Sequence, residues 1–293
     1  MIRALLLAAA LAAAGCAASP AAAQDFSHGI LWKVSRPGIA ASHVYGTIHV
    51  ADPRLAELPV AVRKALAGAR SLMLEYVGDD YGRERFLEAA MFLDRQTLEE
   101  KIGAEDFARV VELLAPIGVG REFVNKLKPW GVLLNLRAPQ QGSGGPTLDA
   151  QLFDQARARR LPILEMEVIE EHVSLFDDLP MASQVALLKH ALAYRDELAG
   201  MARRTLEAYL ARDLAAIWRV QQDFVARHPQ IAAENGALVK RVVFDRNVVM
   251  AFRMQRELRK GRAFVALGAL HLYGPKGVLA LLRKDGYRVA RVY

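Results

Sequence analysis

Short apolar runs and alternating patterns predict strands at both ends of this chain. Residues 31–34 and 42–48 flank the turn-forming sequence Arg36-Pro37-Gly38, and this arrangement predicts a β-hairpin. Residues 263–267 and 287–292 have the same apolar character near the other end. We therefore expect the strands of the sheet to come largely from the two ends of the sequence.

The middle of the chain has mainly helical periodicity. Residues 71–76 and 161–166 are exceptions, because each is a short apolar run that predicts a strand, buried in the case of 161–166. Helices are predicted at 58–69, at 84–137 with breaks at 116–118 and 128–131, at 148–159 after the N-cap Thr147, at 180–260 with a break at 228–229, and near 275. The Gly-rich residues 140–146 predict a loop. The fold class that follows is mixed α/β (α+β), with a central mixed β-sheet built from N- and C-terminal segments and a large helical middle region.

The first 23 residues have the composition of a secretory signal peptide. After Arg3 the sequence is apolar to Ala14, small residues follow to Ala23, and no acidic residue precedes Asp25. The apolar run is too short to span a bilayer, so we expect cleavage near Ala23 or Gln24 and a periplasmic or secreted protein.

Cys16, the only cysteine, permits a second interpretation of this leader. Residues 11–16 resemble a bacterial lipoprotein cleavage box, in which Cys16 would become a lipidated first residue and anchor the protein in the envelope. In both cases the mature fold contains no disulfide, since Cys16 is either removed or acylated. The remaining residues, 24–293, are expected to form a single domain.

Charge and composition argue against a nucleic-acid partner. The formal net charge is +7, or +6 once residues 1–23 are removed, and the basic residues are spread along predicted helices without interleaved aromatic residues. We expect a peptide or small-molecule substrate instead. Membrane contact is expected only if Cys16 is lipidated.

Two copies of the pattern Gly-x-x-His close apolar runs near opposite ends of the chain. The first is Gly46-Thr47-Ile48-His49 and the second is Gly268-Ala269-Leu270-His271. A Gly at the end of a strand permits a sharp turn, and sites in α/β sheets are usually built in the loops at strand ends. If the two strands are neighbours, His49 and His271 meet. Glu75 ends the apolar run 71–76 and is expected at the same edge.

The second motif in its setting, residues 264–289, resembles the TraB/GumN family, whose relatives include the Tiki proteins. The resemblance extends over almost the whole mature chain, with matching residues in the family's order at 31–34, 45–49, 74–75, 128–130, 148–149, 164–165 and 246–247. It implies an α/β domain related to erythromycin esterase and haem-binding ChaN-like proteins. It also implies a site built from both Gly-x-x-His motifs and Glu75, which in Tiki relatives is associated with divalent-metal-dependent proteolysis.

Two imidazoles and a carboxylate suit a catalytic divalent ion such as Mn, Co or Zn. His49 and His271 would be ligands of that ion, and Glu75 would be either the third ligand or the general base that takes a proton from water. The resemblance also points to Arg246 and Asn247. Arg246 could hold a substrate carboxylate or an oxyanion, and Asn247 could act as a neutral donor.

Each candidate also has a structural interpretation. A strand-end histidine is often only hydrogen-bonded, Glu75 could cap a helix, and Arg246 could be the internal partner of Glu75, Asp149 or Glu165. Asp149 and Glu165 themselves are expected to support the structure or the site, and Trp130 to be a core aromatic residue. The remaining histidines are not expected to be ligands: His28, His43, His172, His190 and His228. No Gly-x-Ser-x-Gly elbow is present.

Three functions fit these observations. The leading hypothesis is a periplasmic metal-dependent hydrolase, similar to a metalloprotease, that acts on a peptide or another acyl bond. The second is an esterase-like hydrolase without a metal, in which His49 or Glu75 activates water directly. The third is a non-catalytic envelope protein that binds a metal or haem or supports polysaccharide assembly.

Overall fold

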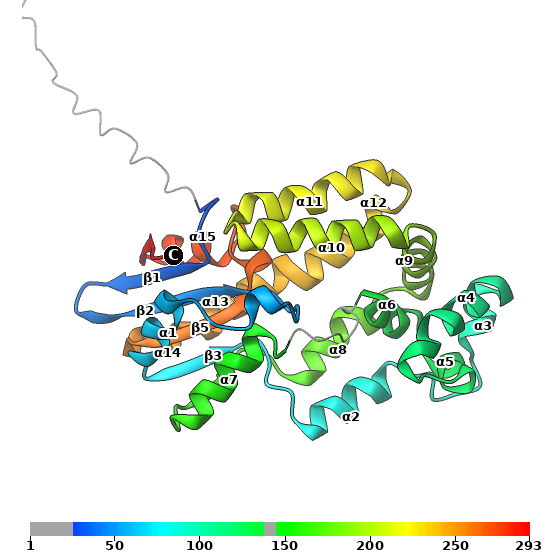
Figure 1. Ribbon diagram of the computed structural model, residues 1–293, viewed down its shortest axis with the longest axis horizontal. Coiled ribbons are helices and arrows are strands. Elements are labelled where there is room, and N and C mark those ends of the chain that lie inside the picture. Colours follow the sequence, from blue (N-terminus) through cyan, green and yellow to red (C-terminus); the bar gives the residue numbers. More distant parts are fainter. Residues whose placement is uncertain (1–25, 138–144) are drawn as a thin grey trace, which may run out of the picture.

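A mixed six-stranded sheet organises the computed structural model, which describes residues 26–137 and 145–293 (Figure 1). The strands are β1 (Leu31–Arg36), β2 (Ile39–Thr47), β3 (Ser71–Leu74), β4 (Ile163–Glu165), β5 (Ala263–Gly268) and β6 (Arg288–Arg291), in the spatial order β4-β3-β5-β2-β1-β6. Four of the six come from the first 50 or the last 31 residues. The predicted mixed α/β class, with its sheet drawn from the two ends of the chain, is confirmed.

The predicted hairpin forms the antiparallel half of the sheet. Strand β1 pairs with β2 around a turn in which Gly38 has a φ of +74°, a conformation that glycine adopts without strain. Strand β6 pairs antiparallel with the other edge of β1. The two ends of the described chain are therefore joined by hydrogen bonds.

The parallel half brings distant parts of the sequence together. Strand β5 lies between β2 and β3 and is parallel to both, with Thr47 opposite Gly268 and Met73 opposite Val265. Strands β2, β3 and β5 consequently end at the same edge of the sheet. The two Gly-x-x-His strands are therefore neighbours, which is the condition under which His49 and His271 were expected to meet.

Helices fill the connections, as the sequence predicted. They are α1 (Val60–Ala67), α2 (Asp80–Ala89), α3 (Leu98–Ile102), α4 (Ala104–Leu114), α5 (Arg121–Lys126), α6 (Pro129–Arg137), α7 (Leu148–Ala158), α8 (Ile169–Asp177), α9 (Met181–Ala193), α10 (Arg195–Leu210), α11 (Leu214–Arg227), α12 (Ala232–Val239), α13 (Arg246–Arg253), α14 (Gln255–Lys260) and α15 (Val278–Lys284). Helix α7 packs on β3 and β4, whereas α14 packs on β2 and β5. Helices α2–α6 and α8–α12 extend beyond the sheet, to the right in Figure 1.

The start of α7 and a π-helical segment before α13 bear directly on the site. Thr147 caps α7 and accepts a hydrogen bond from the Ala150 amide, as predicted. Residues Lys240–Asp245 form a π-helical segment that leads into α13. Such segments are rare and are frequent at functional sites.

The hydrophobic core has one large part and two smaller ones. The large part surrounds the sheet and includes Trp32 and Phe264, both fully buried. The smaller parts lie among the helices, around Phe107 and around Leu238. Trp130 is 1% exposed, as expected of a core aromatic residue.

The structure corrects one prediction and leaves others untested. The run 161–166 does form a strand, but β4 is an edge strand and none of its residues is buried. Residues 1–25, with the predicted signal peptide and Cys16, lie outside the described residues, as does most of the predicted loop 140–146. Helix α8, which follows β4, was not predicted.

Candidate functional site

His49, Glu75 and His271 follow three neighbouring parallel strands and converge beside Gly268. A methyl group built on the Gly268 Cα would lie 3.5 Å from Glu75 Oε1, 3.5 Å from His271 Cδ2 and 3.7 Å from His49 Nε2. The Nε2 of His271 lies 3.7 Å from Glu75 Oε1. The predicted gathering of these three residues is therefore present in the structure.

The glycines of the two motifs serve close packing rather than an unusual backbone turn, because neither has a positive φ. A Cβ at Gly46 would lie 2.6 Å from Leu272 Cδ1 and 3.2 Å from Ala269 Cα. Only glycine therefore lets β2 pack against the turn that carries His271. Gly268 instead leaves the space between the three site residues open.

Glu75 is a buried carboxylate with both oxygens bonded. Oε1 accepts a hydrogen bond of 2.6 Å from the Gly268 amide, and Oε2 accepts one of 2.5 Å from Arg246 Nη2. Burial alone would raise the pKa of Glu75. The charge of His271 when its ring is protonated, the charges of Arg246 and His49, and the Gly268 amide together lower this pKa below its usual value. Glu75 is therefore ionised and a weak base.

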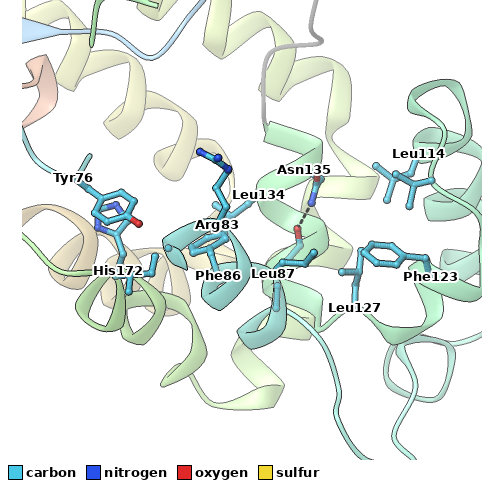
Figure 2. A pocket seen from close by; sticks show the side chains of 15 residues that line it. Tyr76, Arg83, Phe86, Leu87, Leu114, Phe123, Leu127, Leu134, Asn135 and His172 are labelled. Atoms are coloured by element: carbon cyan, nitrogen blue, oxygen red, sulfur yellow. Dashed lines mark hydrogen bonds between the residues drawn. The ribbon is translucent and has the colours of Figure 1, made fainter. Parts of the chain in front are cut away.

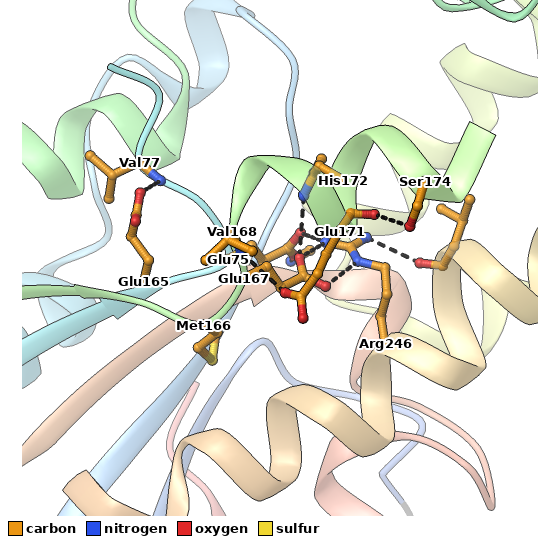
Figure 3. A network of polar contacts seen from close by, with 12 residues as sticks. Glu75, Val77, Glu165, Met166, Glu167, Val168, Glu171, His172, Ser174 and Arg246 are labelled. Carbon is orange, nitrogen blue, oxygen red and sulfur yellow. Dashed lines mark hydrogen bonds and ion pairs between the residues drawn. The ribbon is translucent and has the colours of Figure 1, made fainter. Parts of the chain in front are cut away.

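Arg246 lies at the centre of a buried ion network with Glu75 and Glu167 (Figure 3). Its Nε and Nη2 donate to the two oxygens of Glu167, at 2.7 and 2.6 Å, and Nη2 also donates to Glu75. Its Nη1 faces the Val242 carbonyl at 3.1 Å and His271 Nε2 at 3.3 Å. Arg246 has no free donor for a substrate in this arrangement.

Asn247 fixes the orientation of His271. The Nδ2 of Asn247 donates to the Lys276 carbonyl, so its Oδ1 faces His271 Nδ1 at 2.7 Å. We therefore assign the His271 proton to Nδ1 and a lone pair to Nε2. Burial, which is the largest effect, lowers the pKa of His271 to about 4, so the ring is neutral near pH 7.

His49 differs from the other two because it faces solvent. Its side chain is 62% exposed, and its Nδ1 lies 3.0 Å from Oδ2 of Asp149, the second residue of α7. Thr47 holds the other oxygen of Asp149 with a hydrogen bond of 2.9 Å. The interaction with Asp149 raises the pKa of His49 to about 9. Its Nε2 remains directed at the space beside Gly268.

The comparison with known families agrees with this geometry. The model of the TraB/PrgY/gumN family matches residues 30–291, which include every strand of the sheet and all five predicted site residues. The chain belongs to the TraB/PrgY/gumN family.

Similar curated members of the family have no assigned function. An uncharacterized protein called YbaP from Shigella flexneri is 25% identical over 255 residues, which is 85% of this chain and 90% of that protein. YbaP from Escherichia coli K12 gives the same identity and coverage. An uncharacterized protein from Treponema pallidum is 24% identical over 276 residues, covering 87% of this chain and 80% of that one. No solved structure gave a significant match.

A single divalent ion does not fit the three predicted ligands of this TraB/PrgY/gumN chain as they are arranged. Among residues 26–137 and 145–293, no group of three His, Cys, Asp or Glu side chains has the geometry of a metal site. The Arg246 guanidinium contacts both His271 Nε2 and Glu75, where an ion shared by these two residues would lie. A cation there would also be repelled by the arginine. The predicted divalent metal stays a prediction.

Two residues of the site have roles that the sequence did not reveal. Glu167 is 4% exposed, and both of its oxygens bind Arg246. Of the partners predicted for Arg246, Glu75 is confirmed, and Asp149 and Glu165 are not. Glu165 instead accepts a hydrogen bond from the Val77 amide. Asp149 was expected to support the structure or the site, and its contact with His49 agrees with that expectation, although the sequence did not indicate His49 as its partner. Glu167 lies two residues after the end of β4, and this position was the only feature of the sequence that could have indicated its place in the site.

Proposed function

We propose that this chain is an exported acyl hydrolase that needs no metal and uses His49 as the general base. The observation that supports the proposal most strongly is the pairing of His49 Nδ1 with Asp149, which leaves Nε2 directed into an accessible space beside the buried Glu75 and His271. A histidine oriented by a carboxylate is a common arrangement for taking a proton from a nucleophile.

The other candidates are less suited to the role of base. Glu75 has a lowered pKa, and both of its oxygens accept hydrogen bonds. His271 is buried, and its Nε2 faces Arg246. His49 alone of the three motif residues combines an accessible nitrogen with a raised pKa.

The proposed reaction begins with water beside His49. The base is the unprotonated form of His49, which becomes the main form as pH rises through about 9. The water oxygen attacks the substrate carbonyl carbon while the unprotonated His49 Nε2 takes one water proton, and Asp149 stabilises the imidazolium that forms. Collapse of the tetrahedral intermediate breaks the bond to the leaving group, which receives the proton from His49. Arg246 acts through its charge and by fixing Glu75, since its donors are occupied.

Metal-dependent hydrolysis is a second proposal, favoured by one observation. Donor atoms of His49 and Glu75 and the ring of His271 all lie within 3.7 Å of one point beside Gly268. Binding of a divalent ion there would require Arg246 to leave His271. The two proposals share residues and differ in what a chelator does.

Export is also a proposal, based on residues 1–23 and on the alternative of lipidation at Cys16. No helix within the described part of the chain is long and apolar enough to cross a membrane. N-terminal sequencing of the mature protein distinguishes cleavage near Ala23 from modification at Cys16. A mature chain that begins at Met1 contradicts both.

Hydrolysis is tested with a panel of carboxylic esters and peptide amides, using detection of the acid product. We expect His49→Gln to abolish turnover, and His28→Gln, at a histidine whose side chain is 56% exposed, to leave it unchanged. Equal turnover by both variants contradicts the role of His49. Absence of turnover across the panel contradicts the hydrolase and favours an envelope binding protein.

A further inference from the structure

An apolar cavity of about 400 Å³ lies among α2, α4, α5, α6 and α8, beside the candidate site (Figure 2). Its volume is in the range of pockets that bind small molecules. Most of its lining is aliphatic or aromatic, and Leu87 and Phe123 are 47% and 39% exposed where they line it. It is therefore an open groove and not a closed packing defect.

One end of this cavity adjoins the ion network. Tyr76 and His172 line that end, with ring centroids 5.6 Å apart. Tyr76 directly follows Glu75, and His172 Nδ1 lies 3.5 Å from Oε2 of Glu167 (Figure 3). The charges of Arg246, Glu75 and His49 all influence the pKa of His172, which burial lowers. One end of the cavity therefore lies against the buried network that contains Glu75, Glu167 and Arg246.

The position of Tyr76 depends on a glycine in α2. A Cβ at Gly82 would lie 1.4 Å from the Tyr76 hydroxyl oxygen, so no larger residue fits there while Tyr76 keeps this place. The Tyr76 hydroxyl is buried and has no hydrogen-bond partner among the described residues, whereas the buried Nδ1 of His172 faces the Glu167 carboxylate. An unpaired hydroxyl is therefore found at the end of the cavity that adjoins the network.

The rest of the lining offers few groups to a polar ligand. The Asn135 amide donates to the Gly131 carbonyl within its own helix. Arg83 binds Asp80 and the Gly78 carbonyl at the surface. A bound peptide would lose hydrogen bonds to water along its backbone without replacing them, at about 1–3 kcal/mol for each buried group. An aliphatic chain loses none.

We propose that this cavity binds the aliphatic chain of an acyl substrate, with the acyl carbonyl directed past Tyr76 and His172 toward His49. This inference rests on the proposed hydrolase function and specifies its substrate class. The chain would lie along α2 and α6, in contact with Leu87 and Leu134. The carboxyl end would meet the unpaired Tyr76 hydroxyl.

The test combines direct binding with turnover. Fluorescent dansylundecanoate is titrated into the full-length mature protein, and 4-nitrophenyl esters from acetate to dodecanoate are compared by kcat/KM. We expect saturable probe binding, displacement by dodecanoate, and a rise of about two- to fourfold in kcat/KM per methylene until the cavity is filled. Leu87→Trp and Leu134→Trp should weaken probe binding at least tenfold and abolish the dependence on chain length.

Leu93→Trp is the matched control, because Leu93 is 76% exposed and lies outside this cavity. Circular dichroism and thermal melting confirm that each variant is folded. Probe binding that Leu87→Trp weakens, without ester turnover, supports the cavity and contradicts the hydrolase. Turnover that is independent of chain length supports the hydrolase and overturns this inference. Binding of an apolar tetrapeptide amide in preference to dodecanoate also overturns it.

Discussion

The imidazole of His49 lies 3.0 Å, from Nδ1 to Oδ2, from the carboxylate of Asp149, which stands in the first turn of helix α7. The pair joins the loop after β2 to a helix that packs on β3 and β4. It places the one exposed histidine of the site beside a carboxylate. The proposed hydrolase depends on this pair.

Asp149→Asn should change the pH profile of the reaction. The interaction with Asp149 raises the pKa of His49 to about 9, so the basic form increases as pH rises through 9. Without the carboxylate the pKa moves toward about 6.5, and the rising limb of kcat/KM should move to lower pH. The plateau should fall by roughly 10²–10⁴-fold as the ring loses its orientation. Asp154→Asn, at an exposed position of the same helix, should leave the profile unchanged, and an unmoved limb in Asp149→Asn would contradict the pairing.

Arg246→Met should be strongly destabilising. The change leaves Glu75 and Glu167 buried without their cation, which costs about 3–5 kcal/mol by comparison with other broken buried ion pairs. Arg241→Met removes an arginine whose partner Asp178 is 61% exposed, and should cost at most about 1 kcal/mol. Urea unfolding of the two variants measures the difference. If both variants lose the same free energy of unfolding, the buried network around Arg246 stabilises the fold no more than the exposed pair of Arg241 and Asp178 does.

His271 should make the protein less stable in acid. Its folded-state pKa of about 4 lies below the unfolded value of 6.5. The unfolded chain therefore binds a proton first, so the contribution is fully present above pH 6.5 and is lost as pH falls toward 4. The loss is about 3 kcal/mol. His271→Gln should flatten the dependence of melting temperature on pH between 6.5 and 4, and an identical slope in both proteins would show that His271 is not held neutral.

Gly268→Ala should remove activity while keeping the fold. The backbone at Gly268 has a φ of −54°, which any residue adopts, and the new methyl would meet its neighbours at ordinary contact distances of 3.5–3.7 Å. It would, however, fill the space beside His49 Nε2 that water and a carbonyl require. We expect kcat/KM to fall by about 100-fold or more with an unchanged melting temperature. Gly120→Ala, where a Cβ meets nothing within 4 Å, is the control. Full activity in Gly268→Ala would show that the reaction does not take place beside Gly268.

Much of the fold could be predicted because its strands carry local signals. The hairpin before His49, the strand before Glu75 and the strand before His271 are each apolar and end in recognisable residues. Strand β4 was predicted correctly, but the prediction that it is buried was wrong. A short apolar run also suits a partly exposed edge strand, so the pattern alone does not determine burial. Which strands are neighbours depends on pairing across some 220 residues, and only the repeated motif indicated it.

The site could be predicted as a gathering of residues but not as a pattern of contacts. His49, Glu75, Arg246, Asn247 and His271 do converge. Glu167 was missed because it belongs to no motif and its link to Arg246 spans 79 positions of the sequence. The pairing of His49 with Asp149 was also missed, because neither residue indicates the direction of the other's side chain.

Turnover of metal-depleted protein tests the metal-free reaction at His49 most directly. Wild type and His49→Gln are dialysed exhaustively against a chelator, their metal content is measured, and ester hydrolysis is followed in the same samples. We expect metal-free wild type to keep its full kcat/KM and His49→Gln to have no activity. Loss of activity on chelation, with recovery on addition of Mn²⁺, Co²⁺ or Zn²⁺, would contradict the metal-free reaction and establish the metal-dependent alternative.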